Sequence, residues 1–148
     1  MFVRLFDLPD MEAVVEMSRY NMTSTRPTLT FNEERCRETL ESAVAHASPT
    51  IYVVEDKREV IGFLVADFFP HQAADGLYAV QQVLFVKPEK RGTRAATLLM
   101  RQLTTWAERI GCNEIIGGND NEFNSDRTAK FLGHFGFYRV GHAMRRDL

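Results

Sequence analysis

Cysteine is scarce in this sequence, and long apolar segments are missing from it. Cys36 and Cys112 are the only two cysteines among 148 residues. They form no CxxC pair and have no histidine-rich neighbourhood, which argues against a zinc site and against a disulfide framework. No segment approaches the roughly 18 consecutive apolar residues of a membrane span, and the amino terminus lacks the pattern of a secretory signal. We therefore expect a soluble, cytoplasmic protein that has no membrane partner, binds no metal and keeps both thiols reduced.

A surplus of basic charge is also missing. The 18 lysines and arginines are outnumbered by 20 aspartates and glutamates, so the formal net charge is -2. Proteins that bind nucleic acids through bulk charge usually carry a basic surplus on at least one face. We expect no nucleic-acid partner, and any anion-binding site should be local.

The apolar residues that are present suffice for one core. Hydrophobic residues make up 45% of the chain, and a chain of this length is expected to form one domain, residues 1–148. Their spacing alternates between the period of a strand and that of a helix. The expected strands are 2–6, 50–56, 60–69, 77–86, 112–118 and 138–148. The expected helices are 8–20, one that begins at a capping box of Thr30 and Glu33, one that ends before Gly111, and one that begins at Asn124 or Ser125.

The segment LFVKPEKRGTRAATLLMRQL, residues 84–103, joins the longest apolar strand to the most regular helix through a basic turn. The first amides of a helix are unpaired and carry the positive end of the helix dipole, so they attract anions. Gly92 allows the backbone to approach a ligand, and two alanines at 95 and 96 leave room beside it. Arg91 and Arg94 add guanidinium donors for phosphate oxygens.

Such a turn can also be an ordinary solvated connection between a strand and a helix, and the turn sequence by itself favours that interpretation. Its place favours a binding site, because α/β proteins usually bind ligands beyond the carboxyl ends of strands.

These residues resemble the signature of the GNAT superfamily of acetyl-CoA-dependent N-acetyltransferases, and the turn is similar to that of bacterial or phage-like members. The family pattern is hydrophobic-x-Val-x-Pro at a strand end, followed by Arg/Gln-x-x-Gly-x-Gly/Ala at a helix start. Arg94 stands where the family usually has its middle glycine. The matching positions are Leu84, Val86, Pro88, Arg91 and Ala96.

A second segment, residues 124–141, resembles the family's Asn-x-x-Arg-x-x-x-Phe-Tyr-x-x-x-Gly-Phe pattern. Leu132 occupies the position of the tyrosine, which in the family donates a proton to the leaving sulfur. The matching positions are Asn124, Arg127, Phe131, Gly136 and Phe137.

The resemblance implies an α/β fold with a mixed, mainly antiparallel central sheet and helices on both faces. It implies an enzyme that moves an acetyl group from acetyl-CoA directly to a primary amine. The turn would bind the pyrophosphate, and the strand before it would pair with the pantetheine arm. The implied cofactor-binding residues are Leu84, Phe85, Val86, Arg91, Gly92, Thr93, Arg94, Ala95, Ala96, Asn124, Arg127 and Phe131. Asn124 has an equal alternative as a simple helix cap.

Catalytic groups are harder to assign. The backbone of Leu84 would polarise the thioester, and Gln81 and Gln82 stand where some family members have a glutamate base. A glutamine cannot take a proton at neutral pH, although it can orient an amine. Asp120 and Glu122 are alternative bases, but acids in a polar loop are usually only solvated.

The acceptor does not follow from the cofactor motif, so an amine-bearing small molecule and a protein amino group both remain open. Trp106 and the phenylalanines at 68, 69, 85 and 131 are most simply core residues, and Phe31 and Phe69, which flank loops, are also candidate walls of the acceptor pocket. Edge strands and a carboxy-terminal strand predict a homodimer. The alternatives are a non-catalytic module that binds acyl-CoA or a partner, and a small α/β interaction protein.

Overall fold

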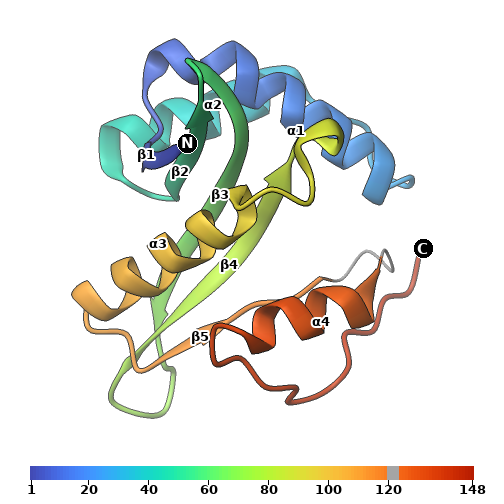
Figure 1. Cartoon of the computed structure of the whole chain (residues 1–148). Coiled ribbons are helices and arrows are strands. Elements are labelled where there is room, and N and C mark those ends of the chain that lie inside the picture. The colour runs from blue at the N-terminus through green and yellow to red at the C-terminus, as the bar shows by residue number, and fades with distance from the viewer. Residues whose placement is uncertain (120–123) are drawn as a thin grey trace.

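The computed structural model describes residues 1–119 and 124–148, and its elements alternate between strands and helices (Figure 1). The strands are β1 (Phe2–Leu5), β2 (Thr50–Asp56), β3 (Glu59–Pro70), β4 (Leu77–Val86) and β5 (Glu114–Ile116). The α-helices are α1 (Met11–Thr25), α2 (Glu33–His46), α3 (Ala95–Arg109) and α4 (Ser125–Gly133), and two short 3-10 helices are η1 (Leu8–Asp10) and η2 (Pro88–Lys90).

The strands form one five-stranded sheet in the order β1-β2-β3-β4-β5. Every neighbouring pair is antiparallel except β4 and β5, which run parallel and are connected through α3. Helix α3 lies on one face of the sheet, and α1 and α2 lie on the other (Figure 1). The predicted mixed, mainly antiparallel sheet with helices on both faces is therefore confirmed.

The core has two layers because the middle strands bury both of their faces. Val54 and Leu64 point toward α3, whereas their neighbours Val53 and Phe63 point toward α1 and α2. Strands buried on both faces have nearly continuous apolar sequences rather than alternating ones. This explains the runs IYVV and VIGFLVA in β2 and β3.

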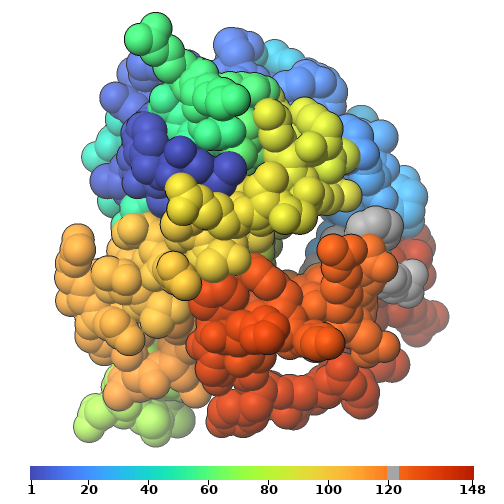
Figure 2. All heavy atoms as spheres, viewed as in Figure 1, coloured from blue at the N-terminus to red at the C-terminus, as the bar shows by residue number. Residues whose placement is uncertain are grey.

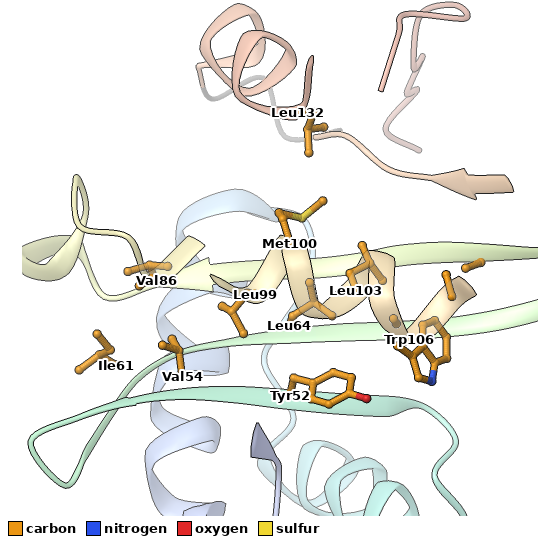
Figure 3. Close-up of a cluster of buried hydrophobic side chains, with 14 residues drawn as sticks. Tyr52, Val54, Ile61, Leu64, Val86, Leu99, Met100, Leu103, Trp106 and Leu132 are labelled. Carbon is orange, nitrogen blue, oxygen red and sulfur yellow. The ribbon is translucent and has the colours of Figure 1, made fainter. Parts of the chain in front are cut away.

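Helix α3 is held on the sheet by the apolar stripe that its sequence predicts. Leu99, Met100 and Leu103 are fully buried, and Trp106 is 8% exposed. Figure 3 shows Leu99 and Trp106 pointing from α3 toward the sheet, and Met100 pointing toward Leu132 of α4. Because the helix is fixed along its length, its amino terminus is held beside the end of β4.

Two expected features are wrong. Helix α2 begins at an N-cap Asn32 rather than at Thr30, because the Asn32 side chain accepts a hydrogen bond from the Arg35 N–H at 2.9 Å. Residues 138–148 form no strand, although apolar and polar residues partly alternate there. No described strand pairs with this segment, so Tyr138 and Val140 stay 83% and 86% exposed.

Further expectations can be compared with the described residues. Both cysteines are free and half-buried, and burial raises the pKa of each thiol. Phe85 is buried as predicted, but Phe68 and Phe69 are 42% and 39% exposed and do not belong to the core. Among residues 1–119 and 124–148, no helix is long and apolar enough to cross a membrane.

The close packing of β3 against β4 generates a prediction about Gly62, which pairs with Val86. A methyl group on Gly62 would lie 2.6 Å from the Phe85 carbonyl oxygen, so Gly62→Ala must push the two strands apart. We expect a loss of about 1–3 kcal/mol in the free energy of unfolding, measured by denaturant titration. The control is Gly133→Ala in α4, where a methyl group meets nothing within 4 Å and should be neutral or stabilising. Equal stabilities of the two variants would contradict this packing.

Candidate active site

The site begins where β4 and β5 separate. Their ladder contains three pairs and ends at Val80 and Ile116. Beyond it, β4 continues to Val86 with no described strand on that edge. Unpaired backbone groups of a strand need a partner, and an extended ligand can supply one.

The hydrogen-bond pattern identifies which amides face this open edge. The Lys87 N–H donates to the Ile61 carbonyl of β3 at 2.9 Å. Because amides along an antiparallel strand point alternately to the two sides, those of Leu84 and Val86 point away from β3. These two amides are therefore available to a ligand that lies along the edge.

The turn between β4 and α3 is fixed by its own hydrogen bonds. Thr93 Oγ1 donates to the Lys90 carbonyl at 2.8 Å and accepts from the Ala95 N–H at 3.3 Å. Gly92 has a φ of +83°, which a glycine adopts without strain. The next amides, those of Ala96 and Thr97, have no acceptor within the part of the chain that is described. The positive end of α3 thus remains open to an anion.

Arg91 is oriented by β4. Its Nε donates to the Val86 carbonyl at 3.2 Å, and its guanidinium carbon lies 5.8 Å from the centre of the Phe85 ring. The two terminal nitrogens have no described acceptor. Lys90 and Arg127 lie nearby, and neither they nor Arg91 form an ion pair with any described residue. This set of positive charges favours a negatively charged ligand.

These features surround a cleft of about 570 Å³ between the turn, the open edge of β4 and helix α4. Figure 2 shows the hollow between the yellow surface of the turn and the orange surface of α4. Asn21 and Thr25 of α1 also line it, although α1 lies on the opposite face of the sheet from α3. The cleft therefore passes through the sheet where the two strands separate.

Most of the predicted site residues come together in this cleft. The lining contains Gln81, Leu84, Phe85, Val86, Arg91, Gly92, Thr93, Ala96, Asn124, Arg127 and Phe131. Three others lie outside it: Gln82 is the extra residue of a β-bulge, Arg94 is exposed at the helix start, and Ala95 is fully buried beneath the turn.

Sequence reasoning missed several lining residues. Lys90 is adjacent to the predicted basic turn, and that position was a usable signal. Asn21 and Thr25 come from a helix about 60 residues earlier in the chain, and Gly118, Asn119 and Thr128 had no distinguishing pattern. Only the topology brings these residues to the cleft.

Gln81 carries an unusual polar atom. Its Oε1 is buried and accepts no hydrogen bond from the described residues. A methyl group on Gly117 would come within 2.9 Å of this oxygen, so the glutamine amide lies against β5 at the point of separation. A buried acceptor without a donor is costly, and a ligand N–H in the cleft would satisfy it.

Asn124 precedes α4 in a left-handed conformation, with φ of 52°, and its side chain makes no capping hydrogen bond. The helix-cap alternative therefore lacks support, and the side chain lines the cleft instead. Leu132 is only 5% exposed and packs in the core cluster against α3 (Figure 3).

The candidate proton-transfer groups are not gathered at the cleft. Asp120 and Glu122 lie outside the described residues. Histidine is a further residue type that can transfer protons, and three of the histidines lie elsewhere: His46 and His134 are exposed, and His71 Nε2 lies 3.2 Å from a Glu114 carboxylate oxygen at the far end of β4. The described lining contains no aspartate, glutamate, histidine, cysteine or tyrosine.

Comparison with known proteins defines the class of this chain. It belongs to the acetyltransferase (GNAT) family, whose model matches residues 15–137, including the strand, the turn and α4. The family consists of acetyltransferases, and acetyl-CoA is its typical donor. No curated protein sequence matches the chain.

Solved structures share the fold at low sequence identity. A transcriptional regulator from Bacillus halodurans has a TM-score of 0.82 at 16% identity, covering 99% of this chain and 98% of the other. An acetyltransferase from Trypanosoma brucei has a TM-score of 0.76 at 16% identity, covering 99% and 98%. A ribosomal-protein-alanine N-acetyltransferase from Brucella melitensis biovar Abortus has a TM-score of 0.76 at 12% identity, covering 99% and 97%.

Proposed function

We propose that the protein transfers an acetyl group from acetyl-CoA directly to a primary amine. The observation that carries this proposal is the continuity of the cleft: the open edge of β4 leads directly to the unpaired amides and cations at the start of α3. That arrangement matches a ligand with an amide-bearing arm and a pyrophosphate at its end.

Acetyl-CoA supplies an activated thioester when it is bound, and the residues present fit it. Arg91 and the amides of Ala96 and Thr97 meet the pyrophosphate, with Lys90 and Arg127 as further cations. The Val86 N–H would donate a hydrogen bond to the pantetheine arm and the Leu84 carbonyl would accept one from it, as in the pairing of an added strand. The Val86 carbonyl also accepts a hydrogen bond from Arg91 Nε. The site for the pantetheine arm and the site for the pyrophosphate therefore lie at the same end of β4.

Acetyl transfer then needs a polarised carbonyl and a correctly placed amine. The Leu84 N–H is a fixed donor at the open edge and stabilises the developing oxyanion. Gln81 Oε1 accepts a hydrogen bond from the acceptor nitrogen and directs its lone pair toward the thioester carbon. Gln82, at the bulge, has no such place in the cleft.

Proton transfer depends on water. The described lining contains no carboxylate, imidazole, thiol or phenol that could serve as a base, and we infer that the acceptor amine loses its proton to solvent before it attacks. The neutral amine forms the carbon–nitrogen bond, the carbon–sulfur bond breaks, the nitrogen releases its extra proton to water, and water protonates the thiolate, whose ordinary pKa is about 8.5. Positioning and carbonyl polarisation supply the rate enhancement.

A non-catalytic module that binds acyl-CoA is the second candidate function. The observation in its favour is Leu132, a buried leucine at the position of the family's proton donor. The two candidates differ in turnover and agree on the cofactor.

The proposal predicts both binding and turnover. Millimolar acetyl-CoA should raise the melting temperature, because a ligand specific for the folded state stabilises it. With a panel of primary amines, CoA release should exceed the spontaneous rate and should increase with pH as the amine loses its proton. Binding without release across the whole panel would support the non-catalytic module, and an unmoved melting temperature would contradict both candidates.

Arg91→Ala should weaken CoA more than it weakens pantetheine, which has no pyrophosphate. Loss of charge-assisted hydrogen bonds to phosphate predicts an affinity for CoA that is roughly tenfold to a hundredfold lower by calorimetry. Arg101→Ala is the control, since Arg101 is an exposed residue of α3 that does not line the cleft. An equal loss of affinity for CoA and for pantetheine would show that Arg91 does not contact the phosphates.

Leu132→Tyr should raise turnover or leave it unchanged. A phenol that reaches the leaving sulfur adds general acid catalysis, which is typically worth 10²–10⁴-fold, and one that does not reach it leaves the water route intact. Leu132→Ala should instead lower the free energy of unfolding by about 2–5 kcal/mol with a smaller change in kcat. A tyrosine variant that stays folded but loses turnover would contradict this account of proton transfer.

Self-association is a further prediction. Because residues 138–148 form no strand, the edge strand β1 is the feature that supports it. This strand lies at the edge of the sheet, and its Phe2 and Leu5 are 53% and 57% exposed. Pairing of two such edges would form a homodimer. Light scattering at high micromolar concentration should give twice the monomer mass, and a monomer mass would contradict the prediction.

A further inference from the structure

Tyr20 of α1 is a large exposed side chain that the site described above does not use. It is 49% exposed and does not line the cleft, although Asn21 and Thr25 of the same helix do. Its ring lies 5.8 Å from that of Phe85 in β4, with an angle of 60° between the two planes. Edge-to-face pairs at this distance are favourable beyond the area that they bury. Tyr20 therefore joins α1 to the last part of β4.

The Phe85 ring is held from two sides. Phe63 is its cross-strand partner in β3, and the two rings lie 6.0 Å apart. Tyr20 contacts the same ring from α1, and Phe85 is only 5% exposed. A ring packed between two others has little freedom to turn. The guanidinium carbon of Arg91 lies 5.8 Å from the centre of this ring, which is within the range of a cation–π contact.

The contact with the ring matters because Arg91 is an exposed side chain. A long flexible side chain loses conformational entropy when it is ordered by a ligand. The hydrogen bond from Arg91 Nε to the Val86 carbonyl, at 3.2 Å, fixes one nitrogen. The guanidinium can still swing about that bond. The Phe85 ring limits this swing, and so it limits the directions in which the two terminal nitrogens can point.

We propose that Tyr20 is a positioning residue for the phosphate site: it holds the Phe85 ring, and the ring holds the Arg91 guanidinium in place for the pyrophosphate. The proposal rests on the proposed function, because it requires CoA to bind at Arg91. Tyr20 acts only through Phe85 and does not contact the cofactor. The role needs an aromatic ring at position 20 and not a hydroxyl, since the Tyr20 hydroxyl forms no hydrogen bond with the described residues.

The test measures the affinities for CoA and for pantetheine by calorimetry. Contacts of this kind change an equilibrium by about twofold to tenfold, so Tyr20→Ala should weaken CoA by that factor. Its affinity for pantetheine, which has no pyrophosphate, should not change. Tyr20→Phe keeps the ring and should bind CoA as wild type does. Thr23→Ala is the control, because Thr23 is an exposed residue of α1 that does not line the cleft.

A double variant shows whether Tyr20 acts through Arg91. When Arg91 is already alanine, the guanidinium that the ring holds is absent. Adding Tyr20→Ala to Arg91→Ala should therefore cause no further loss of CoA affinity. Two substitutions that act independently would instead give losses that add in free energy.

Several outcomes would overturn the proposal while the proposed acetyl transfer stands. Wild-type CoA affinity in Tyr20→Ala would do so, and so would additive losses in the double variant. An equal loss for CoA and for pantetheine would show that Tyr20 supports β4 as a whole and does not position Arg91. A Tyr20→Phe variant as weak as Tyr20→Ala would assign the effect to the hydroxyl. No binding of CoA by the wild-type protein would defeat the proposed function and this proposal together.

Discussion

The site depends on one constraint, the separation of two parallel strands. The β4–β5 ladder ends at Val80 and Ile116, and every feature of the site lies beyond that point. A parallel strand that loses its neighbour leaves backbone groups that must be satisfied, and here the sheet leaves those of Leu84 and Val86 available. The same separation extends the cleft through the sheet, so that Asn21 and Thr25 of α1 line it as well.

Rigid packing on either side keeps this opening in place. Helix α3 is held by fully buried side chains along its length, so its unpaired first amides cannot move away from the end of β4. Arg91 is held in turn by the Val86 carbonyl. Arg91 is therefore placed before any ligand arrives, which lowers the cost of ordering it on binding.

The sequence predicts the parts of this structure that depend on local chemistry. Apolar periodicity predicts the strand and the helix between residues 84 and 110. The glycine at 92 and the arginines around it predict the basic turn that joins them. The N-cap was misplaced because Thr30 with Glu33 fits a capping box as well as Asn32 fits a simple cap. The carboxy-terminal strand was expected from alternation alone, which cannot reveal whether a partner strand is within reach. The places of Asn21 and Gly117 beside the cleft depend on register and topology, which a local pattern does not contain.

The most direct test of the central claim is amide hydrogen exchange along β4, measured with and without saturating acetyl-CoA. Val83 and Phe85, whose amides face β3, should be protected in both states. The amides of Leu84 and Val86 should exchange faster in the free protein and become protected when acetyl-CoA binds, because the pantetheine arm occupies the edge that β5 leaves open. Binding of acetyl-CoA with no added protection at Leu84 and Val86 would contradict the account.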